Sequence, residues 1–211
     1  MSSLPEVAEL LRAAVREATE ATDAANAATG SAGRAVVVLI DGPSGAGKST
    51  LADLLVAEWP TTAAPQLVRM DDLYPGWSGL DVASVSIGRD LLTPLLAGLP
   101  AGWRRWNWAD DAPAEWHAVD PARPVVVEGC GTLARANAPQ ADLCIWLDAD
   151  DVLRKERALA RDGLAFEGHW DQWQSDFERY VDREHPRRNA DLILDVTACS
   201  IETGSTRLAG R

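Results

Sequence analysis

Short apolar runs alternate along this chain with stretches in which apolar residues recur at helical spacing. The apolar runs are rich in Val, Ile and Leu, are typical of buried strands, and cover residues 34–41, 66–70, 124–129, 141–148 and 190–196. The helical spacing is clearest over residues 80–97 and 170–184. Strands that alternate with helices specify a parallel sheet covered on both faces. We therefore expect the α/β fold class, with a five-stranded, mainly parallel sheet.

A further amphipathic segment precedes the first apolar run. Apolar residues recur at helical spacing over residues 4–28, which predicts a helix with a short Gly/Ser-containing linker behind it. This helix either packs across its own domain or meets a partner, as in a homodimer, and the sequence leaves both open. We divide the chain into residues 1–33, the helix and linker, and residues 34–211, the main unit, and expect them to form one domain. The polar tail from Thr197 carries either a short extra strand or no regular structure.

Tryptophan is unusually common, with nine Trp against two Tyr and two Phe. Residues 103–108 alternate aromatic with polar side chains, as in a short strand or hairpin. An aromatic and arginine cluster can stack on a planar base or pair with a phosphate, but a hairpin with one buried aromatic face has the same pattern. Trp106, Trp108 and the nearby His117 are therefore candidate substrate contacts, with a structural role as the open alternative.

Charge and cysteine usage narrow the classes of partner. A net charge of −12 and a pI of about 4.6 argue against nucleic acid or an anionic membrane as the main partner. Small anionic substrates stay open, because local arginines can override the global sign. Cys130, Cys144 and Cys199 lack metal-ligand spacing, and we expect free thiols in a reducing compartment. We recognise no signal peptide and no membrane-spanning run, so we expect a cytoplasmic protein.

The strongest chemical signal is the sequence Gly-Pro-Ser-Gly-Ala-Gly-Lys-Ser-Thr at residues 42–50, which fits the phosphate-binding loop G-x-x-x-x-G-K-[ST] in full. It lies between a strand-type run and a helix-type run, which is the context that this motif requires. The glycines let the backbone wrap a phosphate, and the helix N-terminus adds partial positive charge. The residues that we predict to contact a nucleoside triphosphate are Gly42, Ser44, Gly45, Ala46, Gly47, Lys48, Ser49 and Thr50.

Two acids are expected at the same edge of the sheet as the phosphate loop. Asp71 follows the second strand and Glu128 ends the third, and ligands of open α/β sheets bind at the carboxyl ends of strands. Lys48 would bridge the β- and γ-phosphates, and Ser49 would ligate Mg²⁺. Asp71 could orient Mg²⁺-bound water or accept a proton from an attacking hydroxyl, and Glu128 could hold Mg²⁺ through water. A turn or cap role is the alternative for both acids, and for the neighbouring Asp72.

A third cluster is basic. Arg154, Arg157 and Arg161 lie close to one face of a helix predicted over residues 151–162. Like charges on one face repel unless an anion lies among them, and a lid that closes over a triphosphate has this layout. A solvated face with acidic neighbours is the alternative. The Gly-containing segment 163–173 is the predicted mobile lid.

The order of these motifs resembles the uridine kinase and phosphoribulokinase branch of P-loop kinases, over roughly residues 34–196. It comprises the phosphate loop, Asp-Asp-Leu-Tyr, the aromatic hairpin, Val-Val-Val-Glu-Gly and Arg-x-x-Arg-x-x-x-Arg-Asp. The resemblance implies a three-layer P-loop NTPase fold with a small lid. It also implies that Asp71 activates the acceptor hydroxyl, that Tyr74 and residues 106–108 line the acceptor pocket, and that Arg157 and Arg161 contact phosphates.

The activity that this resemblance implies is transfer of the γ-phosphoryl group of ATP, with Mg²⁺, to a hydroxyl of a small acceptor, such as the nucleosides uridine or cytidine. The chain departs from the family in the lid, which lacks the usual arginine-containing extension, and in the hairpin, which has Trp and Asn107 where Tyr and a carboxylate are common. A kinase for a non-nucleoside alcohol, such as pantothenate or a sugar phosphate, therefore stays open. So does a nucleotide-binding switch or scaffold whose output is a partner contact.

Overall fold

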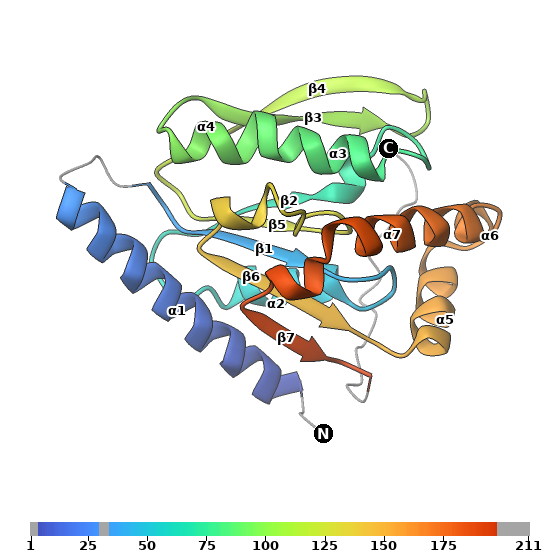
Figure 1. Cartoon of the computed structure of the whole chain (residues 1–211), viewed down its shortest axis with the longest axis horizontal. Helices are drawn as coiled ribbons and strands as arrows, with labels where there is room; N and C mark the ends of the chain where they lie inside the picture. The colour runs from blue at the N-terminus through green and yellow to red at the C-terminus, as the bar shows by residue number, and fades with distance from the viewer. Residues whose placement is uncertain (1–3, 30–33, 198–211) are drawn as a thin grey trace.

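The computed structural model describes residues 4–29 and 34–197, and at its centre lies a five-stranded parallel sheet (Figure 1). The strands of this sheet are β1 (Val37–Asp41), β2 (Gln66–Arg69), β5 (Val125–Glu128), β6 (Leu143–Asp148) and β7 (Leu192–Asp195). Their order is β2-β5-β1-β6-β7, and all the pairings are parallel. The expected sheet is confirmed. Because β1 is central, the loop that follows it opens between the carboxyl ends of β5 and β6.

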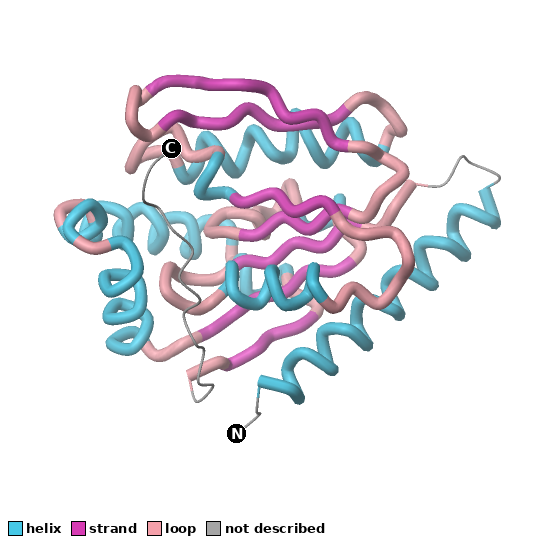
Figure 2. Tube along the Cα trace, turned by 180° about the vertical axis from the view of Figure 1, so that it is seen from behind, coloured by secondary structure: helices cyan, strands magenta, loops and turns pink. Residues whose placement is uncertain are grey.

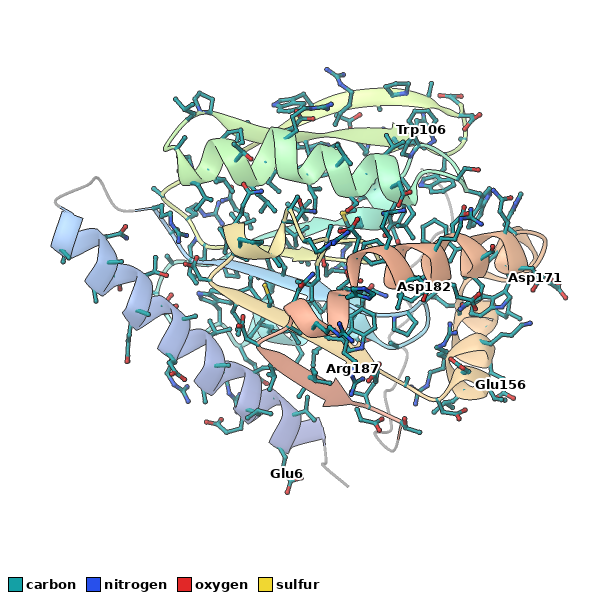
Figure 3. All side chains as sticks on the ribbon, viewed as in Figure 1. Glu6, Trp106, Glu156, Asp171, Asp182 and Arg187 are labelled. Atoms are coloured by element: carbon teal, nitrogen blue, oxygen red, sulfur yellow. The ribbon has the colours of Figure 1, made fainter. Side chains whose placement is uncertain are left out.

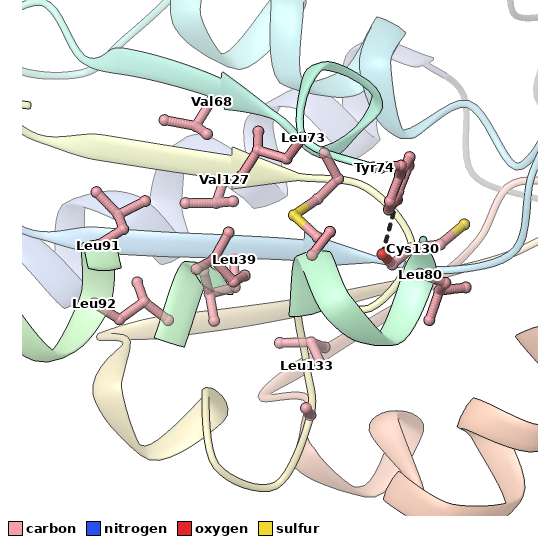
Figure 4. Packing of buried hydrophobic residues seen from close by; sticks show 14 of the residues in the cluster. Leu39, Val68, Leu73, Tyr74, Leu80, Leu91, Leu92, Val127, Cys130 and Leu133 are labelled. Atoms are coloured by element: carbon pink, nitrogen blue, oxygen red, sulfur yellow. Dashed lines mark hydrogen bonds between the residues drawn. The ribbon is translucent and has the colours of Figure 1, made fainter. Parts of the chain in front are cut away.

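Helices cover both faces of the sheet, so the three-layer arrangement is also confirmed. One face is covered by α1 (Leu4–Thr29) and α2 (Lys48–Ala57). The other face is covered by α3 (Leu80–Ser86), the π-helical segment η2 (Ile87–Leu92), α4 (Thr93–Leu96) and α7 (Trp170–Glu184). The strand residues divide accordingly: Val38 and Ile40 belong to the first apolar cluster, and Val37 and Leu39 to the second, part of which Figure 4 shows. Full burial on both sides explains why β1 is apolar along most of its length.

The apolar stripe of α1 is used within the chain. Val7, Leu11 and Val15 are buried in the same cluster as residues of α2 and β6. Arg12 of α1 also forms an ion pair with Glu58, directly after α2. Of the two roles that the sequence leaves open for this helix, packing across its own domain is the one observed.

The aromatic hairpin consists of β3 (Ala101–Asn107) and β4 (Ala112–Val119), which pair antiparallel with an irregularity between Arg104 and Trp106. It lies on the β2 side of the sheet in both Figure 1 and the reverse view of Figure 2. Three short 3₁₀ segments, η1 (Met70–Asp72), η3 (Ala138–Gln140) and η4 (Pro186–Asn189), join other elements. None of the helices among residues 4–29 and 34–197 is long and apolar enough to cross a membrane.

The segment after β6 differs from its prediction. The expected helix is present as α5 (Asp151–Asp162), capped by Asp150, whose side chain accepts hydrogen bonds from two backbone amides of the first turn. The loop predicted over residues 163–173 is wrong in part, because it contains the helical turn α6 (Leu164–Glu167), whereas the helix predicted over residues 170–184 is confirmed as α7. Phe166 and Trp170 explain the difference. Both are buried in the second apolar cluster, the one that contains Leu39, and this burial orders the backbone between them. The linker 30–33 and the tail from residue 198 lie outside the described residues.

Candidate active site

The phosphate loop connects the end of β1 to the start of α2 at Lys48, as the sequence predicts. Gly42, Gly45 and Gly47 all have positive φ, at 146°, 79° and 92°. Close packing adds a second requirement for glycine at two of them. A Cβ on Gly42 would collide with the carbonyl oxygen of Leu147, and a Cβ on Gly45 would collide with that of Arg154. The end of β6 and the first turn of α5 therefore rest directly on the phosphate loop.

Lys48 is held against this loop. Its side chain is buried, and Nζ donates to the carbonyl oxygens of Gly42 and Pro43, both at 2.9 Å. The same Nζ lies 3.5 Å from Sγ of Cys130, in the loop after β5. The ammonium group is thus fixed beside the first residues of the loop and the loop after β5. The lysine of this motif contacts the β- and γ-phosphates when a nucleotide is bound.

Glu128 lies beside the first turn of α2. It is 3% exposed, accepts a hydrogen bond from the Ser49 hydroxyl, and lies 3.3 Å from the Arg69 guanidinium. Burial raises the pKa of Glu128, and the charge of the nearby Asp71 raises it further, while Lys48, Ser49 and Arg69 oppose the shift. The structure therefore brings together four predicted site residues, namely Lys48, Ser49, Asp71 and Glu128.

The two adjacent acids of η1 lie in different surroundings. The charge of Asp71 acts on Glu128, Tyr74 and Cys130, which all lie on the phosphate-loop side. Burial raises the pKa of Asp72, and Asp71 adds to this rise, whereas the cations Arg69 and Arg105 and the imidazole of His117 oppose it. Asp71 is thus close enough to the groups beside the phosphate loop to affect their pKa values, and the pKa of Asp72 is affected by groups of the hairpin. The Trp108 indole supports this turn by donating to the carbonyl oxygen of Asp71 at 2.9 Å.

The donor set fits a magnesium ion that is shared with a nucleotide. Among the described residues, no group of three or more His, Cys, Asp or Glu side chains has the geometry of a metal site. Mg²⁺ in nucleotide sites characteristically uses one or two protein oxygens and completes its octahedron with phosphate oxygens and water. The Ser49 hydroxyl and the Glu128 carboxylate are hydrogen bonded to each other and supply such oxygens, with Asp71 close by.

The predicted acceptor-pocket residues are divided between the core and the hairpin. Tyr74 is buried, and its hydroxyl donates to the carbonyl oxygen of Cys130 at 2.8 Å, as Figure 4 shows. His117 stacks on Trp103 with ring centroids 4.3 Å apart, and its Nε2 lies 3.3 Å from Glu115. Tyr74 therefore fixes the loop after β5, and His117 is engaged within the hairpin.

Of the four tryptophans of the hairpin and its turn, Trp106 and Trp108 are the two predicted acceptor contacts. Trp108 is 40% exposed, and Nε1 of Trp106 is buried without a hydrogen-bond partner in the part of the chain that the structure describes. Trp106 lies on the hairpin, at the opposite end of the molecule from Glu6 of α1 (Figure 3).

Trp77, in the turn between η1 and α3, is a contact that the sequence analysis does not single out. Its ring stacks with Phe166 and His169, with centroids 5.3 Å and 4.7 Å away and an interplanar angle of 12° in both pairs. Its centroid also lies 5.0 Å from that of Trp108. Trp77 thereby joins the α6–α7 junction, which is the predicted lid, to the turn that carries Asp71.

The three arginines of α5 do not share one environment. Arg154 is 5% exposed, donates to Asp151 at 2.7 Å and to Gln174 at 2.9 Å, and lies over the Trp170 ring. Its side chain therefore ties α5 to α7. Arg157 is half-buried and Arg161 is exposed on the same helix. The proposed phosphate contacts of Arg157 and Arg161 stay predictions.

Two hydrogen bonds from α7 reach the phosphate loop and the residue before it. They could not be predicted from the sequence, because helical spacing over residues 170–184 does not show which groups the apolar side chains meet. Trp173 donates from Nε1 to Oγ of Ser44 at 2.8 Å, and Tyr180 donates to the Asp41 carboxylate at 2.7 Å. Asp41 is fully buried at the end of β1 and also accepts from the backbone amides of Gly42 and Leu133. A carboxylate in an otherwise apolar run, directly before the loop, is the one sequence signal that points to this network.

No family model and no curated protein matches the chain. Solved structures do match it. A possible uridine kinase from Bacillus stearothermophilus has a TM-score of 0.56 and 19% identity over 85% of this chain and 98% of that one. A protein provisionally named as a fructose transport system kinase, from Silicibacter sp. TM1040, has a TM-score of 0.54 and 18% identity over 76% of this chain and 90% of that one.

The chain has a P-loop NTPase-like α/β fold. Within that class it has the fold of uridine kinase-like P-loop kinases, as the likeness to these structures shows.

Proposed function

We propose that this protein is an ATP-dependent kinase that transfers the γ-phosphoryl group to a hydroxyl of a small acceptor. The observation that carries the proposal is the convergence of a phosphate loop, its lysine and two acids at one edge of the sheet. Mg²⁺-nucleotide binding alone would use Glu128 at the end of β5, so Asp71, which follows β2, is an additional acid that could act as a base. The kinase names of the two structural relatives also support this proposal.

The roles of the chain's residues follow from their surroundings. The loop amides and Lys48 would bind the phosphates, and Ser49 and Glu128 would hold Mg²⁺, which neutralises charge that develops on them. Asp71 would take the proton of the acceptor hydroxyl while the hydroxyl oxygen bonds to the γ-phosphorus. At the same time the bond between the γ-phosphorus and the oxygen that leaves with ADP breaks. Arg157 and Arg161 of α5 would contact the transferring group.

Asp71 is a better base than Glu128 for a geometric reason. Glu128 is buried, bonded to Ser49 and close to Arg69, so an acceptor hydroxyl has little access to it. Asp71 is exposed, and its own turn is held by Trp108. An acceptor hydroxyl could reach it from the side of the hairpin, where Trp106 and Trp108 would contact the rest of the acceptor.

Two kinds of acceptor are considered for this site, namely nucleosides and small non-nucleoside alcohols. A nucleoside such as uridine or cytidine agrees with the name of one structural relative and with the tryptophans of the hairpin. A sugar phosphate or a pantothenate-like alcohol is the alternative within the enzyme class. A switch or scaffold is less well supported, because the helix that would meet a partner packs on its own chain.

The test is an acceptor panel with Mg-ATP, in which ADP release is followed by a coupled assay and the product by mass spectrometry. We expect at least one nucleoside or small alcohol to stimulate ADP release and to gain one phosphoryl group. Lys48→Ala and Asp71→Asn should each lose product formation by at least ~100-fold, since a positioned base and a phosphate-binding charge each contribute about that much. Asp90→Asn is the matched control, because Asp90 is an acid that pairs with its neighbour Arg89 at the surface, outside the site. ADP release that no acceptor stimulates would favour the switch.

A further inference from the structure

Helix α7 contacts the phosphate loop at two places through one face. Trp173 and Tyr180 are separated by two helical turns, and both are buried. Trp173 is bonded to Ser44 within the loop, and Tyr180 to Asp41, the residue directly before Gly42. Because α7 follows the predicted lid, these bonds connect the lid segment to the groups that would bind phosphate.

The hydrogen bond between Trp173 and Ser44 has only one possible direction. An indole N–H is a donor and never an acceptor, so Oγ of Ser44 must accept from it at 2.8 Å. The hydroxyl proton of Ser44 is therefore left to donate elsewhere. Oγ of Ser44 also lies 3.7 Å from Sγ of Cys130, and sulfur is a weak acceptor.

The position of this hydroxyl indicates what it would donate to. Oγ of Ser44 and Nζ of Lys48 both lie against the same atom, Sγ of Cys130, at 3.7 Å and 3.5 Å. The lysine of a phosphate loop reaches the β- and γ-phosphates. The Ser44 hydroxyl therefore lies at the γ-phosphate end of the loop, with its proton uncommitted to any strong acceptor among the described residues.

We propose that Trp173 is a positioning residue for the γ-phosphate: its indole fixes the Ser44 hydroxyl so that the proton is donated to a γ-phosphate oxygen. This inference rests on the proposed kinase function. The indole is held in place by edge-to-face contact with Tyr74, at 4.8 Å between ring centroids. The Asp41–Tyr180 bond holds the next turns of α7 to the start of the loop. The arrangement favours nucleotides that carry a third phosphate.

The test compares the binding of two nucleotides, Mg-ADP and the non-hydrolysable analogue Mg-AMP-PNP, by calorimetry. Trp173→Phe keeps an aromatic ring but removes the donor. We expect it to weaken AMP-PNP binding about 10-fold and ADP binding less than about 2-fold, because a hydrogen bond to a charged group contributes on the order of 1.5 kcal/mol. Ser44→Ala should give the same selective loss, and the double variant should lose no more than either single variant.

Trp59→Phe is the matched control. Trp59 also donates from its indole to a hydroxyl, that of Thr61 at 3.0 Å, but at the far end of α2. This variant should bind both nucleotides as the wild type does. Ser44→Thr, which keeps a hydroxyl, should restore part of the AMP-PNP affinity that Ser44→Ala loses.

Equal weakening of ADP and AMP-PNP in Trp173→Phe would overturn the inference, because it would show that the indole only supports the fold. Multiplicative losses in the double variant would also overturn it. If Trp173→Phe does not fold, Ser44→Ala decides alone, and AMP-PNP affinity equal to that of the wild type would reject the proposal. A wild-type protein that binds neither nucleotide rejects the kinase function itself, which is a separate outcome.

Discussion

Replacing Gly45 by alanine tests whether α5 rests on the phosphate loop. A Cβ built on Gly45 lies 1.9 Å from the carbonyl oxygen of Arg154, in the first turn of α5. Carbon and oxygen in van der Waals contact need more than 3.0 Å, so the loop or the helix must move by about 1 Å. Both are backbone, and neither can yield by a rotamer change.

The expected loss of stability has two parts. The φ of 79° at Gly45 is left-handed, and a non-glycine residue there costs about 1–2 kcal/mol. Overpacking against backbone adds roughly 1–3 kcal/mol. We therefore expect Gly45→Ala to lower the free energy of unfolding by about 2–5 kcal/mol, a large part of the roughly 5–15 kcal/mol of a typical domain.

The chain offers a control that separates the two parts. Gly98 has a similar φ of 64°, but a Cβ there meets no atom within 4 Å. Gly98→Ala should therefore show only the conformational cost, about 1–2 kcal/mol. Urea unfolding of both variants, followed by circular dichroism, measures the difference. If Gly45→Ala is no more destabilised than Gly98→Ala, α5 does not rest on the loop and the reasoning fails.

Three further predictions concern the acids, the thiols and the lid. Arg69→Gln removes a cation that lowers the pKa of Glu128, so the pKa of Glu128 should rise. Because Glu128 must be ionised to hold Mg²⁺, the acid limb of the pH–kcat profile should move to higher pH. An acid limb that does not move would contradict this role of Glu128. Burial raises the pKa of Cys144 to about 12 and also raises the pKa of Cys130. Both thiols should therefore be protonated at pH 8 and should resist iodoacetamide until urea is added. Alkylation of either residue in the folded protein, mapped by mass spectrometry, would contradict this. Trp77→Ala removes the ring that stacks on Phe166 and His169. We expect the free energy of unfolding, measured in urea, to fall by roughly 1–3 kcal/mol and proteolysis near residues 163–169 to become faster. Proteolysis at the wild-type rate would show that the stack does not order the lid.

The sheet, the phosphate loop and α5 follow from short-range signals in the sequence. Apolar runs give the buried strands because a strand covered on both faces has no polar side, and the loop motif records the backbone conformation that it needs. The same reasoning predicts that Asp71, Glu128 and Lys48 share one edge, since the carboxyl ends of parallel strands meet there, and Asp71 and Lys48 both act on the pKa of Glu128.

The contacts of α7 and the ordering of the lid do not follow in this way. Trp173 and Ser44 are 129 positions apart, and helical periodicity indicates only that Trp173 faces inward. Whether an inward indole meets a hydrophobic neighbour or a hydroxyl depends on how α7 is placed on the sheet. Segment 163–173 shows the same limit, because its two glycines suggest a loop, while burial of Phe166 and Trp170 depends on partners elsewhere in the chain, such as Trp77.

Phosphoryl transfer by this protein can be tested by measuring nucleotide binding and acceptor-stimulated turnover on the same two proteins. Asp71→Asn and the wild type are each titrated with Mg-AMP-PNP and then assayed with Mg-ATP and the acceptor panel. We expect both proteins to bind AMP-PNP with affinities within about 3-fold of each other. An acceptor should stimulate ADP release by the wild type, and the variant should lose this stimulation by at least ~100-fold. Acceptor-stimulated ADP release that survives in Asp71→Asn would contradict the assignment of the base, and its absence from the wild type with every acceptor would contradict the kinase.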